Sequence, residues 1–346
     1  MSPFLSIVVP FHNSAGKCAP LLEVLSGVRK EDEVELILVD DGSTDSTVAV
    51  LQEFEASANC PVLLIQRENG GPGAARNSGL DRASGKWVWF VDSDDVIDLH
   101  AIAFARMSGW PDVDVIAWEF HHPWPGVSCP IAPGLHEVRD VPAPPEAMET
   151  IPAKWFARAF LERTGLRFPE YCVYEATPIE DFVLPLLLTR YLKSEFQAYR
   201  AIAGPSITRG EFDLRRFDRL RTTVLGRSYL QRARLDPSTL APFDAAFARL
   251  FLWYSVAPSR LPGRSWIIAA RVMGHYREEA ARLGIRLDPF SVYPGGRKSR
   301  FIARLLWALS AALPSQRGHF DRLRQRSWGR EIDWAVPELP KRWTKD

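Results

Sequence analysis

The 346-residue chain has an ordinary globular composition, with 46% hydrophobic and 25% charged residues, and it is long enough to bury a large core in one or two domains. This balance excludes an intrinsically disordered chain. The N-terminus has no basic leader before an apolar run, and no stretch reaches about 18 uncharged apolar residues. We therefore expect no secretory signal, no membrane span and a cytoplasmic location.

The four cysteines are widely spaced and form no Cys-x-x-Cys pair. This spacing argues against a zinc site and against a disulfide framework. We expect free thiols, mostly buried, at Cys18, Cys60, Cys129 and Cys172.

The net charge of +1 conceals an asymmetry along the chain. Residues 1–199 hold 15 Lys and Arg against 29 Asp and Glu, whereas residues 200–346 hold 28 against 13. Two interpretations are open for the second half: helices whose solvated faces use arginine, or a functional basic surface that attracts anions.

Short apolar runs alternate with helical patterns through the first 120 residues. This alternation predicts βαβ units, a mostly parallel sheet with helices on both faces, and therefore an α/β fold. The expected strands are 5–10, 34–40, 61–66, 87–92 and 113–120. The expected helices lie near 15–28, 45–57, 73–84 and 98–107.

Each of the first four expected strands ends in polar or conformationally special residues. Ligands of such sheets bind beyond the carboxyl ends of the strands, so these four loops are expected to converge on one candidate site. The loops are residues 10–13, 40–43, 67–71 and 92–95.

The rest of the chain is expected to be loop and helix. Proline and glycine recur too often in 121–134 for a helix. Residues 150–163 have helical spacing, with Trp155, Phe156 and Phe160 on one face and Gly165 as the stop. A further helix is expected from 178 to 192, and an Arg-rich helical pattern follows from about 214.

The stretch "WVWFVDSDD" places Asp92, Asp94 and Asp95 at the end of a buried strand. Carboxylates that crowd together raise one another's pKa unless a cation compensates the repulsion. Mg²⁺ or Mn²⁺ prefers oxygen ligands and commonly shares one or two carboxylates with substrate phosphates. The alternative is structural, with Asp94 or Asp95 capping the next helix.

The stretch "VDDGSTDST" ends the second strand with Asp40 and Asp41. A carboxylate there could accept a hydrogen bond from the N3–H of uracil or from a ribose hydroxyl, and Gly42 permits close backbone approach. The ordinary alternative is a helix cap from Ser43, Thr44 or Asp45.

The stretch "ENGGPGAARNSGL" does not fit the dinucleotide-binding fingerprint, because its glycines have the wrong spacing and follow the third strand. It predicts a glycine-rich helix entry with free N–H groups. Arg76, one turn into that helix, could reach an anion or pair with the acidic cluster.

Five stretches, in order and at familiar spacing, resemble the inverting family 2 glycosyltransferases of the GT-A fold. They are "SIVVPFHNS", "VDDGSTDST", "NGGPGAARNSGL", "WVWFVDSDD" and "RTGLRFPE…PIEDFVL". The resemblance covers about residues 4–210. It implies a GT-A catalytic domain over 1–212, with a nucleotide-sugar part at about 1–120 and an acceptor part at about 121–212, followed by an Arg-rich helical region over 213–346.

The resemblance also implies donor-binding roles. Pro10 and Phe11 would wall the base pocket, Asp40 and Asp41 would hold base and ribose, and Arg76 with Asn77 would lie beside the uridine. In the Asp-x-Asp stretch, Asp92 and Ser93 would lie near the donor. Asp94 would be the main ligand and Asp92 the second ligand of Mn²⁺ or Mg²⁺, with Asp95 a cap or a supporting group.

For catalysis, the resemblance places the general base on the aspartate of "PIEDFVL", here Asp181, with Glu180 as neighbour or acceptor contact. Its alternative is a favourable charge in a helix's first turn. Diphosphate contacts in a closing loop fall on Ser206, Thr208 and Arg209, which a basic surface turn would equally explain. His12, His121 and His122 are not expected to bind metal.

The stretch 297–330 combines an apolar helical run with flanking arginines, Trp307 and Trp328. Such a helix can lie in an anionic membrane interface, or Phe301, Leu305 and Leu309 can pack within the protein. Peripheral membrane association is therefore a hypothesis, and the oligomeric state stays open.

We expect an enzyme that transfers a hexosyl group from a nucleotide sugar, a UDP-sugar above all, to a saccharide or lipid-linked saccharide, as in bacterial surface polysaccharide synthesis. The alternative is a non-catalytic nucleotide-sugar-binding or scaffold protein. A nucleic-acid partner is not expected, because no interleaved aromatic motif is present and the acidic half would repel phosphates.

Overall fold

The computed structural model describes residues 2–109, 112–121, 132–137, 150–172, 176, 179, 184–202, 222, 224–226, 265–282, 284, 305 and 308–312. The chain divides into two compact units. The first unit is Met1–Pro142, Glu146–Glu170 and Leu187–Gly204. The second is Ala143–Pro145, Tyr171–Leu186 and Pro205–Asp346.

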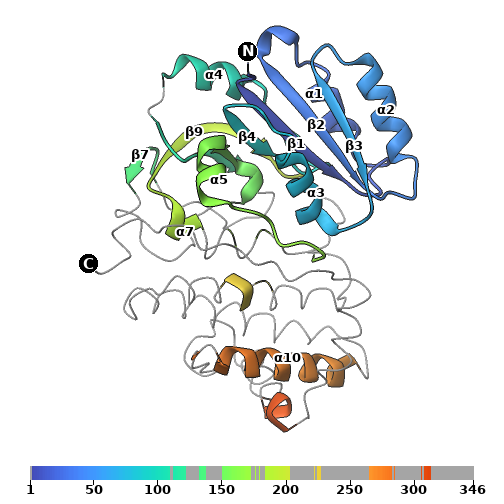
Figure 1. The fold of residues 1–346 in the computed structure, drawn as a ribbon, viewed down its shortest axis with the longest axis vertical. Helices are drawn as coiled ribbons and strands as arrows, with labels where there is room; N and C mark the ends of the chain where they lie inside the picture. The colour runs from blue at the N-terminus through green and yellow to red at the C-terminus, as the bar shows by residue number, and fades with distance from the viewer. Residues whose placement is uncertain are drawn as a thin grey trace. The chain divides into compact units, whose positions relative to one another are not determined.

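The first unit is built on a single mixed sheet (Figure 1). Its main path runs β3-β2-β1-β4-β8-β6-β9-β5, and β7 pairs with β9. The strands are β1 (Leu5–Phe11), β2 (Val34–Asp41), β3 (Val62–Arg67), β4 (Trp87–Phe90), β5 (Val96–Ile97), β6 (Val115–His121), β7 (Gly134–Glu137), β8 (Lys154–Ala157) and β9 (Arg190–Arg200).

Helices follow most of the strands. In the first unit they are α1 (Ala19–Leu25), η1 (Lys30–Asp32), α2 (Thr47–Ser57), α3 (Gly71–Leu80), α4 (His100–Met107), η3 (Ile151–Ala153) and α5 (Arg158–Thr164). The α/β class and the first four strands agree with the sequence prediction, and each strand end lies within two residues of its expected position.

Strands β3, β2, β1 and β4 are parallel neighbours, with β1 pairing both β2 and β4. The chain winds from β1 outward to β3 and then returns to β4 on the other side of β1. Ligands of open α/β sheets bind where the winding direction reverses, beyond the carboxyl ends of the strands. That point lies between the ends of β1 and β4.

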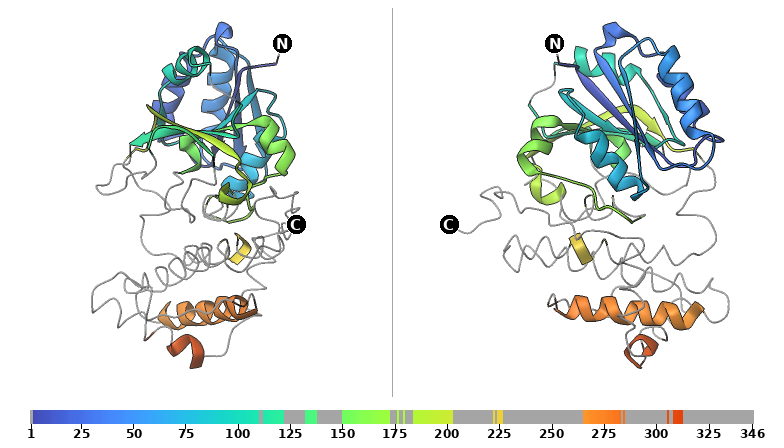
Figure 2. Two further views of the ribbon diagram at one scale, coloured as in Figure 1. Left: turned by 90° about the vertical axis from the view of Figure 1, so that its left-hand side faces the viewer. Right: turned by 45° about the vertical axis from the view of Figure 1, so that its right-hand side comes forward.

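Helices cover both faces of the sheet (Figure 2). Alternate residues of β1, such as Ile7 and Val9, are fully buried in one core with the apolar sides of α1, α2 and α4. On the other face, α3 packs against β1 and β2 so closely that a methyl group on Gly79 would lie 2.3 Å from Cγ1 of Val8. Successive side chains of β1 point to opposite faces of the sheet, and both sets are buried.

The prediction of one helix over 150–163 is wrong in its first half. Lys154–Ala157 is strand β8, which pairs antiparallel with both β4 and β6, and α5 begins only at Arg158. Trp155 and Phe156 are buried on opposite faces of the sheet, so an apolar pair that suits a helix suits a central strand equally. Gly165 ends α5 with φ of 60°, as expected.

The helix expected over 178–192 is also wrong at its end. A short helix, α7 (Leu184–Leu187), is followed by strand β9 from Arg190. Strand β9 pairs with β5, β6 and β7, and those partners are distant in sequence. Whether this segment forms a strand therefore depends on pairing with those partners, and the local sequence pattern does not contain that information.

In the second unit, the structure describes α10 (Ser265–Arg282) and a few shorter pieces. A methyl group on Gly274 of α10 would lie 2.9 Å from the carbonyl oxygen of Ser310, so helix and chain pack closely there. The membrane-interface stretch falls largely outside the described residues, with Leu305 and Leu309 exposed. Among the described helices, none has the length and apolar character needed to cross a bilayer.

Cys18 is a buried free thiol and Cys60 a partly buried one, in agreement with the prediction, and Cys172 is buried. Cys129 lies outside the described residues.

Candidate functional site

The loops that follow β1 to β4 are joined by hydrogen bonds at one edge of the sheet. Ser14 Oγ lies 3.0 Å from Ser93 Oγ, which links the loops after β1 and β4. His12 Nδ1 lies 2.9 Å from the carbonyl oxygen of Asp41 and 3.1 Å from Nδ2 of Asn69. The predicted convergence of the strand-end loops is therefore confirmed, and His12 is engaged by protein groups.

Asn13 fixes the loop that precedes α2. Its backbone is left-handed, with φ of 47°, a conformation that asparagine tolerates better than most residues. Its side-chain oxygen accepts hydrogen bonds from the N–H groups of Thr44 (2.8 Å) and Asp45 (3.3 Å). Asp45 in turn accepts from the N–H of Thr47, the first residue of α2, so it is the cap among the three candidates.

Asp40 has one buried carboxylate oxygen to which no described residue donates a hydrogen bond. Its side chain is 3% exposed, and Oδ2 accepts a hydrogen bond from the N–H of Ser43 at 3.2 Å. Oδ1 is buried and has no hydrogen-bond partner among the described residues. A buried acceptor without a partner is costly, so this oxygen is suited to a donor supplied by a ligand.

Asp41 faces the opposite way and is saturated by protein groups. It accepts from the N–H of Gly70 (3.0 Å) and Gly71 (2.7 Å) at the start of α3, and it pairs with Arg67 Nη1 at 2.7 Å. Burial raises the pKa of Asp41, while the N–H groups and the arginine oppose that rise. Asp41 thus caps α3 from the neighbouring strand.

Gly42 allows the loop after β2 to approach the loop after β3. Its φ is +70°, and a side-chain carbon there would lie 2.8 Å from the backbone nitrogen of Asn69. The close approach that the sequence predicts is therefore between two loops of the protein.

Two aspartates of the acidic cluster have cationic partners within the protein. Arg76, 4% exposed, places Nη2 at 2.5 Å from Oδ1 of Asp92. Lys17 Nζ lies 3.3 Å from Oδ2 of Asp94, and both side chains are partly exposed. The predicted pairing of Arg76 with the cluster is confirmed, and the charge alone does not require a metal ion.

Asp95 is partly buried and bonded to the C-terminal end of β9. It accepts hydrogen bonds from the hydroxyl of Tyr199 and from the N–H of Ile202 at 2.8 Å. Burial raises the pKa of Asp95 to about 7, and the charges of Asp92 and Asp94 add to the rise. Asp95 therefore fixes β9 to the cluster and does not cap α4, whose first N–H bonds to Asp98.

Asp92 and Asp94 are the residues of this cluster that could hold a divalent cation. Asp92 and Asp94 each use one oxygen in an ion pair and are each 37% exposed, so a second hard oxygen of each remains for a cation. The described residues contain no group of three or more His, Cys, Asp or Glu side chains that could hold a metal ion. Two carboxylates are what a cation that also binds a substrate diphosphate requires.

Asn77 is buried and engaged by protein groups. Its Nδ2 donates to the carbonyl oxygen of Phe168 at 2.9 Å and to Glu170 at 3.0 Å, and its Oδ1 accepts from the N–H of Phe168 at 2.9 Å. Contact with uridine stays a prediction for Asn77.

The remaining donor residues lie at the carboxyl ends of β1 and β4. Phe11 is buried, Pro10 is half-buried, and Ser93 is buried against Ser14. Their roles at the base and ribose stay predictions.

Residues 6–103 match the sequence model of the family described as Glycosyl transferase family 2. The chain carries a glycosyl transferase family 2 domain. The first four quoted stretches of the resemblance fall within this match, and the fifth lies beyond it.

Curated relatives match part of the chain. Over 101 residues the chain is 38% identical to poly(ribitol-phosphate) beta-N-acetylglucosaminyltransferase TarS of Staphylococcus aureus, a match covering 28% of this chain and 17% of TarS. It is 34% identical over 125 residues to glycosyltransferase GlyG of Streptococcus pneumoniae, covering 35% and 40%. The matches therefore span less than half of either relative.

Solved structures extend the likeness of fold to most of the chain. S. aureus TarS 1–349 in complex with UDP-GlcNAc superposes with a TM-score of 0.65 at 21% identity, covering 97% of this chain and 98% of that one. The mannosyltransferase PcManGT of Pyrobaculum calidifontis, in complex with GDP-Man and Mn²⁺, gives 0.50 at 18% identity, covering 96% and 89%. The fold is that of the GT-A enzymes.

The predicted base and the predicted acceptor and diphosphate contacts lie outside the described residues. These are Glu180, Asp181, Ser206, Thr208 and Arg209, together with His122.

Three residues that shape the site were not predicted from the sequence: Ser14, Lys17 and Tyr199. Ser14 directly follows the predicted loop 10–13, where a further polar residue after a buried strand could have drawn attention. No local sequence pattern identifies Lys17 or Tyr199, because the aspartates that they bond lie 77 and 104 residues away.

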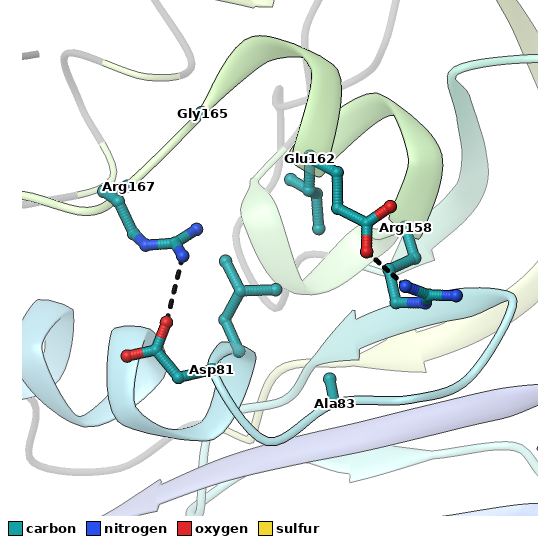
Figure 3. A pocket seen from close by; sticks show the side chains of 8 residues that line it. Asp81, Ala83, Arg158, Glu162, Gly165 and Arg167 are labelled. Atoms are coloured by element: carbon teal, nitrogen blue, oxygen red, sulfur yellow. Dashed lines mark hydrogen bonds and ion pairs between the residues drawn. The ribbon is translucent and has the colours of Figure 1, made fainter. Parts of the chain in front are cut away.

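A cavity of about 250 Å³ lies elsewhere in the first unit, between the C-terminal end of α3 and α5 (Figure 3). Its acids pair with its arginines, Asp81 with Arg167 at 2.9 Å and Glu162 with Arg158. Because α3 begins beside Asp41 and ends beside this cavity, the two sites lie at opposite ends of the helix. None of the predicted site residues lines it.

Proposed function

We propose that the chain is an inverting, metal-dependent glycosyltransferase that moves a sugar from a UDP-sugar to a saccharide or lipid-linked saccharide. The observation that carries the proposal is the buried Oδ1 of Asp40. It has no hydrogen-bond partner in the part of the chain that the structure describes, and it lies in the second strand-end loop beside the switch point of a family 2 domain.

The donor class is supported by the chemistry of that oxygen. The N3–H of uracil is a donor that a buried carboxylate can accept, and such a bond is charge-assisted. The structures of TarS, whose fold this chain shares, include complexes with UDP-GlcNAc and with UDP. We therefore propose UDP-GlcNAc as the first donor to test.

The two outer aspartates would hold the metal. Asp92 and Asp94 supply hard oxygen ligands, and Mn²⁺ accompanies GDP-Man in the related mannosyltransferase structure. When bound, the cation would neutralise the negative charge that builds on the departing nucleoside diphosphate. Arg76 and Lys17 hold Asp92 and Asp94 in place and keep the local charge low before the donor arrives.

The acceptor hydroxyl needs a base on the side opposite the leaving group. The family resemblance assigns this role to Asp181, with Glu180 beside it. A neighbouring carboxylate raises a pKa toward a value useful for accepting a proton near neutral pH.

The acceptor class follows from the relatives. Two of them act on poly(ribitol-phosphate), and another is a minor teichoic acid biosynthesis protein. The basic second half of the chain would suit an acceptor that carries phosphate, whether a polymer or a lipid diphosphate. Peripheral attachment to the cytoplasmic face of a membrane stays a hypothesis.

Two variants test the assignment as an enzyme. Asp181→Asn removes the proposed base and should abolish turnover while UDP-GlcNAc still binds, whereas Asp94→Ala should weaken donor binding in the presence of Mn²⁺. Wild-type protein that binds UDP-GlcNAc but transfers sugar from no nucleotide sugar to any acceptor would indicate a binding or scaffold protein instead.

A further inference from the structure

The first turns of α3 hold a second segment of the chain as well as the acidic cluster. Arg76 binds Asp92, and the next residue, Asn77, binds Phe168 and Glu170. We call residues 166–170 the anchored segment. It is the last part of the first unit before the chain passes, after Glu170, into the second.

The contacts of Asn77 with this segment are specific and buried. Its amide meets both the carbonyl oxygen and the N–H of Phe168, each at 2.9 Å, in the way that one strand meets another. Asn77 is 7% exposed and Phe168 2%. An amide whose oxygen and nitrogen are both used in this way would have to give up these bonds to reach a nucleotide.

Phe168 also contacts the donor side of the site. The guanidinium carbon of Arg76 lies 5.4 Å from the centroid of its ring, and the ring of Phe90 in β4 meets it edge-on at 4.9 Å. Arg76 therefore stands between Asp92 and Phe168. A single turn of α3 fixes both the donor-side aspartate and the anchored segment.

The anchored segment leads directly into the stretch that carries the predicted base. Only nine residues separate Glu170 from Glu180 in the sequence, and Tyr171, the first of them, has a left-handed backbone with φ of 55°. A non-glycine residue in that conformation restricts the direction in which the chain leaves the anchor.

We propose that Asn77 is a positioning residue and not a donor contact: it fixes the anchored segment, which precedes the predicted base in the sequence, with respect to Asp92. The proposal rests on the proposed function for its catalytic consequence. The anchoring itself can be tested without any substrate.

The test uses the full chain with Asn77→Asp, with Glu170→Gln as the matched control and the two combined. Asn77→Asp removes both side-chain N–H donors and sets a carboxylate against Glu170 and the carbonyl of Phe168. Glu170→Gln alone keeps an oxygen acceptor for Asn77 and should be nearly silent. In the double variant, the amide introduced at position 170 can donate to the carboxylate introduced at position 77 and restore one bond.

We expect hydrogen exchange, turnover and UDP affinity to respond differently to Asn77→Asp. Hydrogen exchange of a peptide covering 166–172 should accelerate in Asn77→Asp by roughly tenfold or more and recover in part in the double variant. Turnover with UDP-GlcNAc should fall by a similar factor, whereas the Kd for UDP by calorimetry should stay within about twofold of wild type. That separation distinguishes positioning from a general loss of stability.

The opposite pattern overturns the proposal. If UDP affinity falls about tenfold in Asn77→Asp while exchange of 166–172 is unchanged, Asn77 contacts the donor. If Asn77→Asp does not fold, Glu170→Ala removes one bond and should accelerate the same exchange, and unchanged exchange would equally count against the anchor. Absence of UDP binding to wild type would overturn the proposed function and leave the exchange arm valid.

Discussion

Asp40 and Asp41, which are adjacent at the end of β2, make different contacts. Asp40 keeps a buried oxygen without a partner among the described residues, whereas Asp41 is saturated by Arg67 and the first N–H groups of α3. The sequence predicts ligand contact for both residues. Which of two adjacent carboxylates turns toward a helix start depends on the loop after β3, and the local pattern does not contain that information.

Asp40→Asn is expected to weaken UDP binding and to leave the fold intact. The amide oxygen can still accept from Ser43, but an N–H group replaces the free acceptor that the uracil N3–H would need. Loss of a charge-assisted bond corresponds to a Kd for UDP roughly 10 to 100 times higher. Calorimetry measures it, and an unchanged Kd would remove Asp40 from the donor site.

Asp41→Asn is expected to act on stability. It removes the partner of Arg67 and leaves at least one of the Gly70 and Gly71 N–H groups facing an amide N–H. The free energy of unfolding should fall by about 2–4 kcal/mol, measured by urea denaturation. A variant as stable as wild type would contradict the capping role of Asp41.

The acidic cluster shows a similar limit of sequence reasoning. Its crowding indicates a compensating cation, and the structure supplies Arg76 and Lys17. Arg76 was expected because it follows a helix entry at the same edge. Lys17 could not be predicted because its partner Asp94 is on another strand end 77 residues away.

At the scale of elements, strands β1 to β4 and β6 could be predicted from the sequence, whereas β8 and β9 could not. Strands β1 to β4 are separated by helices with their own periodicity, so each is recognisable from local pattern. Strand β8 forms by pairing with β4 and β6, and strand β9 forms by pairing with β6. Their sequences fit a helix equally well until those partners are known.

The packing of α3 on β1 gives a prediction at this scale. Gly79→Ala would place a methyl group 2.3 Å from Cγ1 of Val8, so α3 would have to move away from the sheet. The free energy of unfolding should fall by about 1–3 kcal/mol. The matched control is Gly16→Ala, where no atom lies within 4 Å of the new carbon and no loss is expected. Equal denaturation curves for both variants would contradict the packing.

At the scale of the whole molecule, the charge of the chain is divided between an acidic and a basic half. The acidic half contains the strand-end site, where Arg76 and Lys17 offset part of the charge. The basic half was not assigned a function from sequence, since a solvated arginine-rich helix and an anion-binding surface have the same composition.

If the basic half binds an anionic surface, the protein should float with vesicles that contain anionic lipid and not with neutral ones. Each cation near such a surface contributes on the order of 1 kcal/mol, so raising the salt concentration should release the protein. Protein that stays in the soluble fraction with both vesicle types would contradict membrane association.

The proposed function depends on a nucleoside diphosphate and a divalent cation binding together at the carboxyl ends of β1 to β4. Calorimetry of UDP with the wild-type chain, with Mn²⁺ and with the metal chelated, tests this most directly. We expect binding with Mn²⁺ that weakens about tenfold or more when the metal is removed or when Asp94 is replaced by alanine. Absence of UDP binding under both conditions would contradict the proposed function.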